Sequence, residues 1–418
     1  MMRKHYRLAL TSLGMGIAEF GDVAYVVSLA ASLYLSGSRS AIHLSFAMAA
    51  YGVGSLAGSW LGGALVDVLP ARRWIVTGNL LAGGLVLVNT VATTLVAVVA
   101  FAGAVSCASR AMLVGQQTVL PLVEPDDLVR ANSVVMVSRR IGQLASPALA
   151  GGLVAAGRLD WVYVVNAGTF CIAGLMMFVA LPPGGRVSRL PRMERGSRIR
   201  DSWHAPAVWS AFAVNSVTGV IVGVSSVSIV VYTGSVLGGG AAEYAALAAF
   251  AAVGAVLGTL TASLVGRLLP TKPAVGTAVA VAGAALAALP FVTWLPAAAV
   301  LRVASGWSVN VVFILLMANL HEGAPAALRG RLIAATRSGQ DTLMIVMTMA
   351  SGFLIAQAGV RWILLAAGLL AGLCALLLAV SRDPFDWRPA VRQDDLRAAA
   401  PLPPQPQPRA GAGALAER

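Results

Sequence analysis

The sequence predicts an all-α integral membrane protein with twelve transmembrane helices arranged as two six-helix pseudo-repeats. Three observations predict this fold: an apolar composition, twelve long apolar runs, and an internal repeat of about 200 residues. Of the 418 residues, 58% are hydrophobic and 11% are charged, and the mean hydropathy is +0.80. Soluble domains have about 45–50% apolar and about 25% charged residues. This chain therefore needs lipid as the solvent for its apolar surface.

The apolar runs are each long enough to cross a bilayer, which takes about 20 mainly apolar residues in a helix. Strands are not expected, because open sheet edges cannot be left in lipid. The twelve expected helices cover residues 8–35, 41–66, 74–93, 95–120, 131–157, 161–181, 206–235, 242–266, 274–293, 295–320, 332–358 and 361–381.

The basic residues predict the orientation of these helices. If the N-terminus is cytoplasmic, 25 Lys and Arg residues fall on the cytoplasmic side and three fall outside. This bias predicts a multi-pass protein of the cell (inner) membrane with both termini in the cytoplasm. The first run is too long for a signal-peptide core and carries Glu19 and Asp22, so we expect it to be retained as a helix.

The net charge of +13 does not indicate a nucleic-acid partner, because the basic residues form short clusters between apolar runs without interleaved aromatics. The three cysteines and four histidines are scattered, so neither a metal site nor a disulfide is expected. No phosphate-binding GxxxxGK[ST] motif and no catalytic constellation is present. We therefore expect no cofactor and no enzymatic activity.

Four segments follow from this pattern. Residues 1–181 are expected to form an N-terminal six-helix bundle and residues 206–381 a C-terminal one. Between them, residues 182–205 form a basic cytoplasmic linker with six arginines. Residues 382–418 are rich in Pro, Ala and Arg and are expected to be a disordered cytoplasmic tail.

The two halves resemble each other in sequence. At an offset of 200, Gly54 matches Gly254 and Gly58 matches Gly258. A second stretch, from Arg130, matches one in the second half at nearly the same offset. Two similar bundles can rock about a central site and open it alternately to either side of the membrane. The repeat therefore indicates a carrier.

The segment GALVDVLPARR, which begins at Gly63, resembles the loop signature between helices two and three of the major facilitator superfamily. The resemblance implies that Gly63 permits close helix contact and that Asp67 caps the start of helix eleven. It also implies that Arg72 and Arg73 hold a cytoplasmic gate. For Asp67 the alternative is an ordinary solvated loop acid.

Other stretches resemble the branch of this superfamily that contains macrolide and siderophore exporters. They include SLGMGIAEFGD from Ser12, RANS from Arg130 and PALAGG from Pro147, and the resemblance extends to about residue 381. It implies proton-coupled efflux, by antiport, of small amphiphilic molecules. The expected partners are the small-molecule substrate, protons and the lipid bilayer, with a functional monomer. A proton-coupled uptake permease and a non-transporting receptor or scaffold are the alternatives.

Three ionisable residues inside the apolar runs are candidates for proton coupling, because such groups are costly in a membrane. Glu19 and Asp22 are three residues apart and share one face of helix one. Glu19 and Arg110 each lie ~16 Å from the cytoplasmic side at 1.5 Å per residue. We expect a carboxylate–guanidinium pair in which Glu19 or Asp22 exchanges a proton while Arg110 adjusts its proton affinity. A static ion pair and direct binding of a cationic substrate are the alternatives.

In the second half, Arg337 and Asp341 are four residues apart and are expected to pair. Arg302 lies near the outer end of its helix, where it could extend to the membrane interface. The expected residues of the substrate cavity are Tyr25, Gln117, Asn215, Trp307, Asn310, Gln340 and Asp341.

Overall fold

The computed structural model describes residues 2–35, 39–91, 94–124, 127–182, 206–323, 329–381 and 385. In this part of the chain, twelve long α-helices follow one another without a strand between them. They are α1 (Met2–Ala30), α2 (Ala41–Val68), α3 (Ala71–Asn89), α4 (Leu95–Thr118), α6 (Leu128–Ala155), α7 (Leu159–Ala180), α9 (Pro206–Ser235), α10 (Ala241–Leu268), α11 (Thr271–Ala288), α12 (Leu295–Gly323), α13 (Arg329–Ala358) and α14 (Val360–Val380).

Three short helical segments accompany them: η1 (Ala31–Leu35), α5 (Leu120–Val123) and η2 (Leu289–Phe291). The twelve expected helices are thus confirmed, with boundaries a few residues from the predicted ones. Except for Pro182 and Phe385, the linker expected over 182–205 and the tail expected over 382–418 lie outside the described residues.

Ten of the described helices are long and apolar enough to cross a membrane, by length and composition alone, and α3 and α6 are the other two long ones. Helix α6 carries Arg139 and Arg140 near its middle, which lowers its hydropathy. Several helices begin at a side-chain cap of the usual kind. Ser40 accepts a hydrogen bond from the His43 amide at 3.3 Å, and Asp127 accepts one from the Arg130 amide at 2.9 Å.

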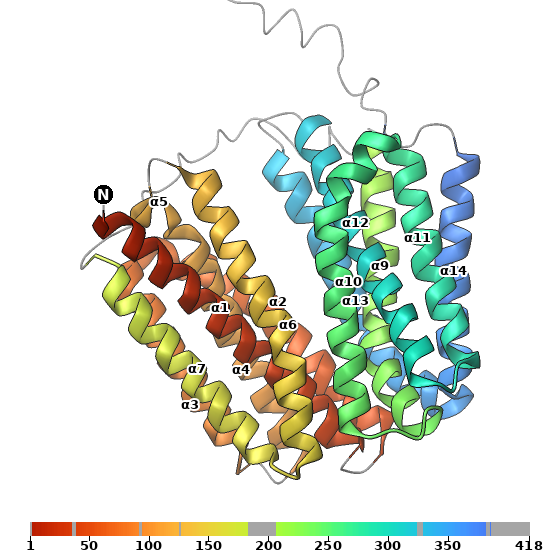
Figure 1. The fold of residues 1–418 in the computed structure, drawn as a ribbon, viewed down its shortest axis with the longest axis horizontal. Coiled ribbons are helices and arrows are strands. Elements are labelled where there is room, and N and C mark those ends of the chain that lie inside the picture. The colour runs from red at the N-terminus through yellow and green to blue at the C-terminus, as the bar shows by residue number, and fades with distance from the viewer. Residues whose placement is uncertain are drawn as a thin grey trace, which may run out of the picture.

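The helices form two groups, which Figure 1 shows side by side. In the first group, α1 packs against α6 and α7, and α2 packs against α4. In the second group, α9 packs against α13, and α10 packs against α12. The pairing of α2 with α4 therefore has its counterpart in the pairing of α10 with α12.

Glycines allow these paired helices to approach closely, and the same glycine contacts occur at equivalent positions in both halves. A methyl group at any of four glycines would overlap the backbone of the facing helix, so each pair of helices approaches closely only because these positions lack a side chain. The contacts are Gly54 with Gly103, Gly58 with Cys107, Gly254 with Val303, and Gly258 with Trp307. Both members of each contact are shifted by 200 residues between the halves, which confirms the two pseudo-repeats.

The close contact expected at Gly63 is not formed. A methyl group there would meet nothing within 4 Å, and Gly63 is exposed. The glycines that face α4 are Gly54, Gly58 and Gly62, each four residues from the next. Gly63 follows Gly62 by one residue and so points to another side of the helix.

Close contacts between the two groups lie towards one end, which we call the closed end. There, Gly352 on α13 lies against Ser45 on α2, and Gly151 on α6 lies against Ala245 on α10. These two contacts are also related by the repeat. Figure 1 shows the groups converging at this end and diverging towards the end where the N-terminus lies.

Candidate functional site

An acidic cavity lies within the first group of helices. It has a volume of about 190 Å³ and is lined by Glu19 and Asp22 from α1, Tyr51 from α2, and Arg110 from α4, among others. The structure thus brings together in one cavity the three residues predicted for proton coupling.

Glu19 is paired with Arg139 and not with Arg110 as expected. Its Oε2 atom accepts hydrogen bonds from Nε of Arg139 at 2.9 Å and from Nη2 at 2.6 Å. The reason is helix packing: Gly16 on α1 and Gly142 on α6 let these two backbones approach closely. Arg139 is therefore a site residue that sequence reasoning missed, although its position inside a predicted helix was a signal for it.

Asp22 has one carboxylate oxygen engaged and one free. Its Oδ2 atom accepts a hydrogen bond of 2.5 Å from Oγ of Ser109 on α4. Its Oδ1 atom is buried and has no hydrogen-bond partner in the described part of the chain. A buried acceptor without a partner is unfavourable, so Oδ1 is a position at which a proton or a donor group can bind.

A chain of hydrogen bonds connects Glu19 to the second group of helices. Gln143 donates to Oε1 of Glu19, and Oε1 of Gln143 accepts from Arg140 at 2.9 Å. Nη2 of Arg140 donates to Oδ1 of Asn310 on α12 at 3.2 Å. The charge on a carboxylate of α1 is therefore linked through α6 to a residue of the other group.

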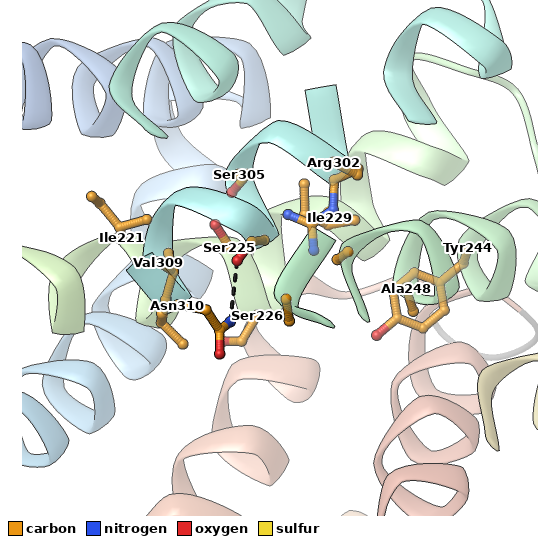
Figure 2. Close-up of a pocket in the computed structure, with 14 residues that line it drawn as sticks. Ile221, Ser225, Ser226, Ile229, Tyr244, Ala248, Arg302, Ser305, Val309 and Asn310 are labelled. Carbon is orange, nitrogen blue, oxygen red and sulfur yellow. Dashed lines mark hydrogen bonds between the residues drawn. The ribbon is translucent and has the colours of Figure 1, made fainter. Parts of the chain in front are cut away.

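A second cavity, of about 280 Å³, lies within the second group of helices between α9, α10 and α12 (Figure 2). Its lining includes Asn310, one of the residues expected in the substrate cavity, together with Ser225, Tyr244 and Arg302. Arg302 lines this cavity, so the expectation that it extends to the membrane interface is wrong.

The two cavities occupy equivalent places in the repeat. Helices α1, α2 and α4 line the first, and their counterparts α9, α10 and α12 line the second. The counterpart of Arg110 at an offset of 200 is Asn310, and both line a cavity. On α1 and α9 the offset is 203, because Gly16 meets Ser138 on α6 as Gly219 meets Gln340 on α13.

The comparison with protein families agrees with this architecture. The sequence model described as Major Facilitator Superfamily matches residues 9–298, which is more than half of the chain. The chain belongs to the major facilitator superfamily. It is therefore a multi-pass membrane protein of a transporter family. A comparison with curated proteins finds no match.

Solved structures of transporters share this major facilitator fold. The nucleoside transporter NupG is 14% identical over 91% of this chain and 98% of its own, with a TM-score of 0.69. A bacterial homologue of the human lysosomal transporter Spinster, in an inward-facing and occupied conformation, is 13% identical over 91% and 98%, with a TM-score of 0.70. A POT family transporter in complex with a thioalcohol-conjugated peptide is 13% identical over 89% and 95%, with a TM-score of 0.69. At these identities the likeness shows the fold, and the resemblance to the exporter branch stays a prediction.

Two aromatic residues expected in the substrate cavity of this major facilitator protein pack elsewhere. Tyr25 is fully buried, and its hydroxyl accepts a hydrogen bond of 3.2 Å from Asn89. Nε1 of Trp307 donates to Oγ1 of Thr261 at 2.8 Å. Neither residue lines the two cavities. Both satisfy their polar atoms against a neighbouring helix, as aromatic residues in bundles commonly do.

Three polar candidates on α9 and α13 also lie outside the two cavities. Asn215 is buried with Nδ2 unpartnered, and Gln340 has a buried Oε1 without a partner, both judged among the described residues. Asp341 does not form the expected salt bridge with Arg337, because the guanidinium of Arg337 lies 4.8 Å from the ring centroid of Phe313. The carboxylate of Asp341 instead interacts electrostatically, without a salt bridge, with the guanidinium groups of Arg337 and Arg110.

The superfamily's loop signature is described only in part. The guanidinium of Arg72 lies 3.7 Å above the ring centroid of Phe178, and Arg73 is exposed. The side chains of Asp67 and of the cavity candidate Gln117 lie outside what the structure describes. The cytoplasmic gate therefore stays a prediction.

Proposed function

We propose that the protein is a proton-coupled exporter of small amphiphilic molecules that works by antiport and alternating access. The observation that carries this proposal is the chain of hydrogen bonds from Glu19 to Asn310, because it links a group able to take up a proton to the contact between the two helix groups. Two similar bundles that contact each other at one end are the architecture that alternating access requires.

In this mechanism, a proton enters the acidic cavity and binds at Asp22, whose Oδ1 is an unused acceptor. Transfer to Glu19, three residues away on the same face of α1, removes the negative charge that holds Arg139 and Gln143. Gln143 and Arg140 then lose the anion that orders them, and the bond from Arg140 to Asn310 weakens. The two groups are freed to rearrange around the cavities.

The hydrogen bonds that Glu19 accepts are strong enough in total to affect the balance between two conformations. Reversing a two-state equilibrium from 1:99 to 99:1 takes ~5.5 kcal/mol. A hydrogen bond to a charged group contributes about 1.5–3 kcal/mol, and Glu19 accepts two such bonds from Arg139 and a further one from Gln143. Neutralising this one carboxylate therefore supplies a large share of the free energy that the transition needs, and substrate binding supplies the rest.

The orientation follows from the distribution of basic residues. We propose that both termini lie in the cytoplasm of a cell with the protein in its inner membrane. The diverging end, where Figure 1 shows the N-terminus, then faces the cytoplasm. We further propose that residues 1–181 and 206–381 are the two moving bodies, joined by the basic linker, and that one chain suffices for transport.

The test is proton flux in proteoliposomes. With a pH gradient imposed and a panel of amphiphilic compounds added, the wild type should dissipate the gradient when a transported compound is present. Glu19→Gln and Asp22→Asn should lose this compound-dependent flux, as should Arg110→Gln if it adjusts their proton affinity. Asp160→Asn, which removes an exposed acid at the start of α7, is the matched control and should keep it.

The outcome can contradict the proposal in two ways. Compound-dependent proton flux that persists in both Glu19→Gln and Asp22→Asn would remove the coupling role of the acidic cavity. Protons that move in the same direction as the compound would make the protein a symporter, and the proposal of export by antiport would be wrong.

A further inference from the structure

The cavity of the second helix group contains an arginine whose charge is not balanced. Nε of Arg302 is buried without a hydrogen-bond partner, and no acid in the described part of the chain forms a salt bridge with it. Tyr244, which also lines the cavity, interacts with it electrostatically, but a neutral phenol does not cancel the charge. Arg302 is only partly exposed, and a partly buried cation without a counter-ion is unfavourable, so the cavity is suited to receive an anion.

Serine hydroxyls line the same cavity as this arginine. Arg302 and Ser305 are three residues apart on α12 and so lie on the same face of the helix, as Figure 2 shows. Ser225, on α9, lines the same cavity, and its Oγ is buried without a partner in the described chain. A guanidinium and hydroxyls that line one cavity offer several donors to the oxygens of one anionic group.

Comparison of the two repeats shows that the two cavities differ in charge. With the offset of 203 on α1 and α9, the counterpart of Asp22 is Ser225, and each lines the cavity of its own half. Glu19 has its counterpart in Val222, so neither acid of the first half is kept in the second. The first cavity therefore contains Arg110 with two carboxylates, whereas the second contains Arg302 and no acid. This difference in charge separates a proton-binding cavity from an anion-binding one.

We propose that the cavity around Arg302 binds the carboxylate of an amphiphilic organic acid, a substrate class that deepens the proposed export function and rests on it. One guanidinium and neutral hydroxyls balance a single negative charge, which matches a carboxylate better than a doubly charged phosphate. The cavity of about 280 Å³ lies just below the usual ligand range of roughly 300–1,000 Å³. It therefore holds the polar end of the substrate, while the apolar part extends between the helix groups.

The position of the cavity explains how such a substrate acts on the transport cycle. Asn310 lines the cavity and accepts the hydrogen bond from Arg140 of the other group. Arg302 lies about two helical turns, or ~12 Å, from Asn310 along α12, so a carboxylate bound there acts on this bond by its charge and not by contact. Binding therefore influences the same contact that the proton on Glu19 controls.

The test is binding to the full chain in nanodiscs, measured by calorimetry with empty nanodiscs as reference. The probes are a panel of aryl and alkyl carboxylates, each with its neutral primary amide and the corresponding phosphate monoester. Wild type should bind at least one carboxylate ~10- to 100-fold more tightly than its amide, as loss of a charge-assisted hydrogen bond implies. Arg302→Gln should abolish this preference, Arg302→Lys should reduce it, and Ser225→Ala should reduce it by a few-fold.

Arg361→Gln, which removes an exposed arginine from the same helix group, is the matched control and should keep the preference. The proposal is overturned if every carboxylate binds no better than its amide, if Arg302→Gln leaves the preference intact, or if the phosphates bind more tightly than the carboxylates. Because binding is measured without a proton gradient, a preference that depends on Arg302 would stand even if the proton-flux experiment failed. Flux without any carboxylate preference would leave the export function and remove this substrate class.

Discussion

Nη2 of Arg140 on α6 lies 3.2 Å from Oδ1 of Asn310 on α12 and joins the two helix groups by a side-chain hydrogen bond. Asn310 is held in place by its own bond to the carbonyl of Gly306 at 3.1 Å. Arg140 in turn is positioned by Gln143, which bonds to Glu19. In the proposed mechanism, this contact responds to protonation of Glu19 and to the arrangement of the two groups.

Asn310→Ala should weaken the conformation described here. It removes the acceptor and leaves one hydrogen bond of Arg140 unmade, a loss of about 1.5–3 kcal/mol for a bond to a charged group. Spin-label distances between α6 and α12 should become broader or longer. Asn319→Ala, about two and a half turns further along α12, is the comparison, and an equal change in both variants would contradict the role of the contact.

Glu19 and Arg139 should be energetically coupled. Each single change, Glu19→Ala or Arg139→Ala, leaves a partly buried charge unpaired and should lower thermal stability. The double variant should lose less than the sum of the two, with a coupling of about 1–3 kcal/mol in a double-mutant cycle. Arg130→Ala, which changes an exposed arginine of the same helix, should add independently to Glu19→Ala. Additive losses for Glu19 and Arg139 would mean that the pair is not formed.

Gly54→Ala and Gly254→Ala should destabilise the protein to a similar degree. Each new methyl group overlaps a backbone carbonyl, of Gly103 and Val303 respectively, which cannot move aside as a side chain can. Overpacking of this kind costs about 1–3 kcal/mol, more than the gain of about 1 kcal/mol in helix propensity. Gly63→Ala has open space and should be neutral or stabilising. Thermal unfolding in one detergent measures all three, and a loss at Gly63 equal to that at Gly54 would contradict the packing.

Gly151→Leu should open the closed end. A side chain there overlaps Ala245 on α10, at a contact between the two groups, so the groups must separate at this end. Gly152→Leu is a neighbouring control, since a side chain at Gly152 meets nothing within 4 Å. Labelling of cysteines placed at the closed end should become faster in Gly151→Leu only. Equal labelling rates in the two variants would show that this contact does not hold the end closed.

The fold could be predicted because its signals are local. The length and hydropathy of each run are properties of neighbouring residues, and a helix in lipid must satisfy its own backbone hydrogen bonds within the run. The repeat was visible for the same reason. Gly54 and Gly254 stand at equivalent positions in the chain because each must approach a facing helix.

The sequence was enough to predict which charged residues of the first half lie near one another, but not which of them form an ion pair. The spacing of Glu19 and Asp22 predicted that they share one face of α1, and the equal depth of Glu19 and Arg110 predicted that these two lie near each other. All three residues line one cavity. Which guanidinium Glu19 binds depended on how closely α1 packs against α6. That distance is set by Gly16 and Gly142, which lie far apart in the chain.

The sequence by itself determined that the chain is a two-fold repeated helical membrane protein with acids in its first helix, since composition, run length and spacing carry that information. Only the tertiary structure decided that Arg139 neutralises Glu19, that Tyr25 and Trp307 pack against neighbouring helices, and that Arg302 faces a cavity. The physical reason is that the rotation of each helix about its axis depends on contacts with helices distant in the sequence. A charged residue's role inside the membrane depends on which way that rotation turns it.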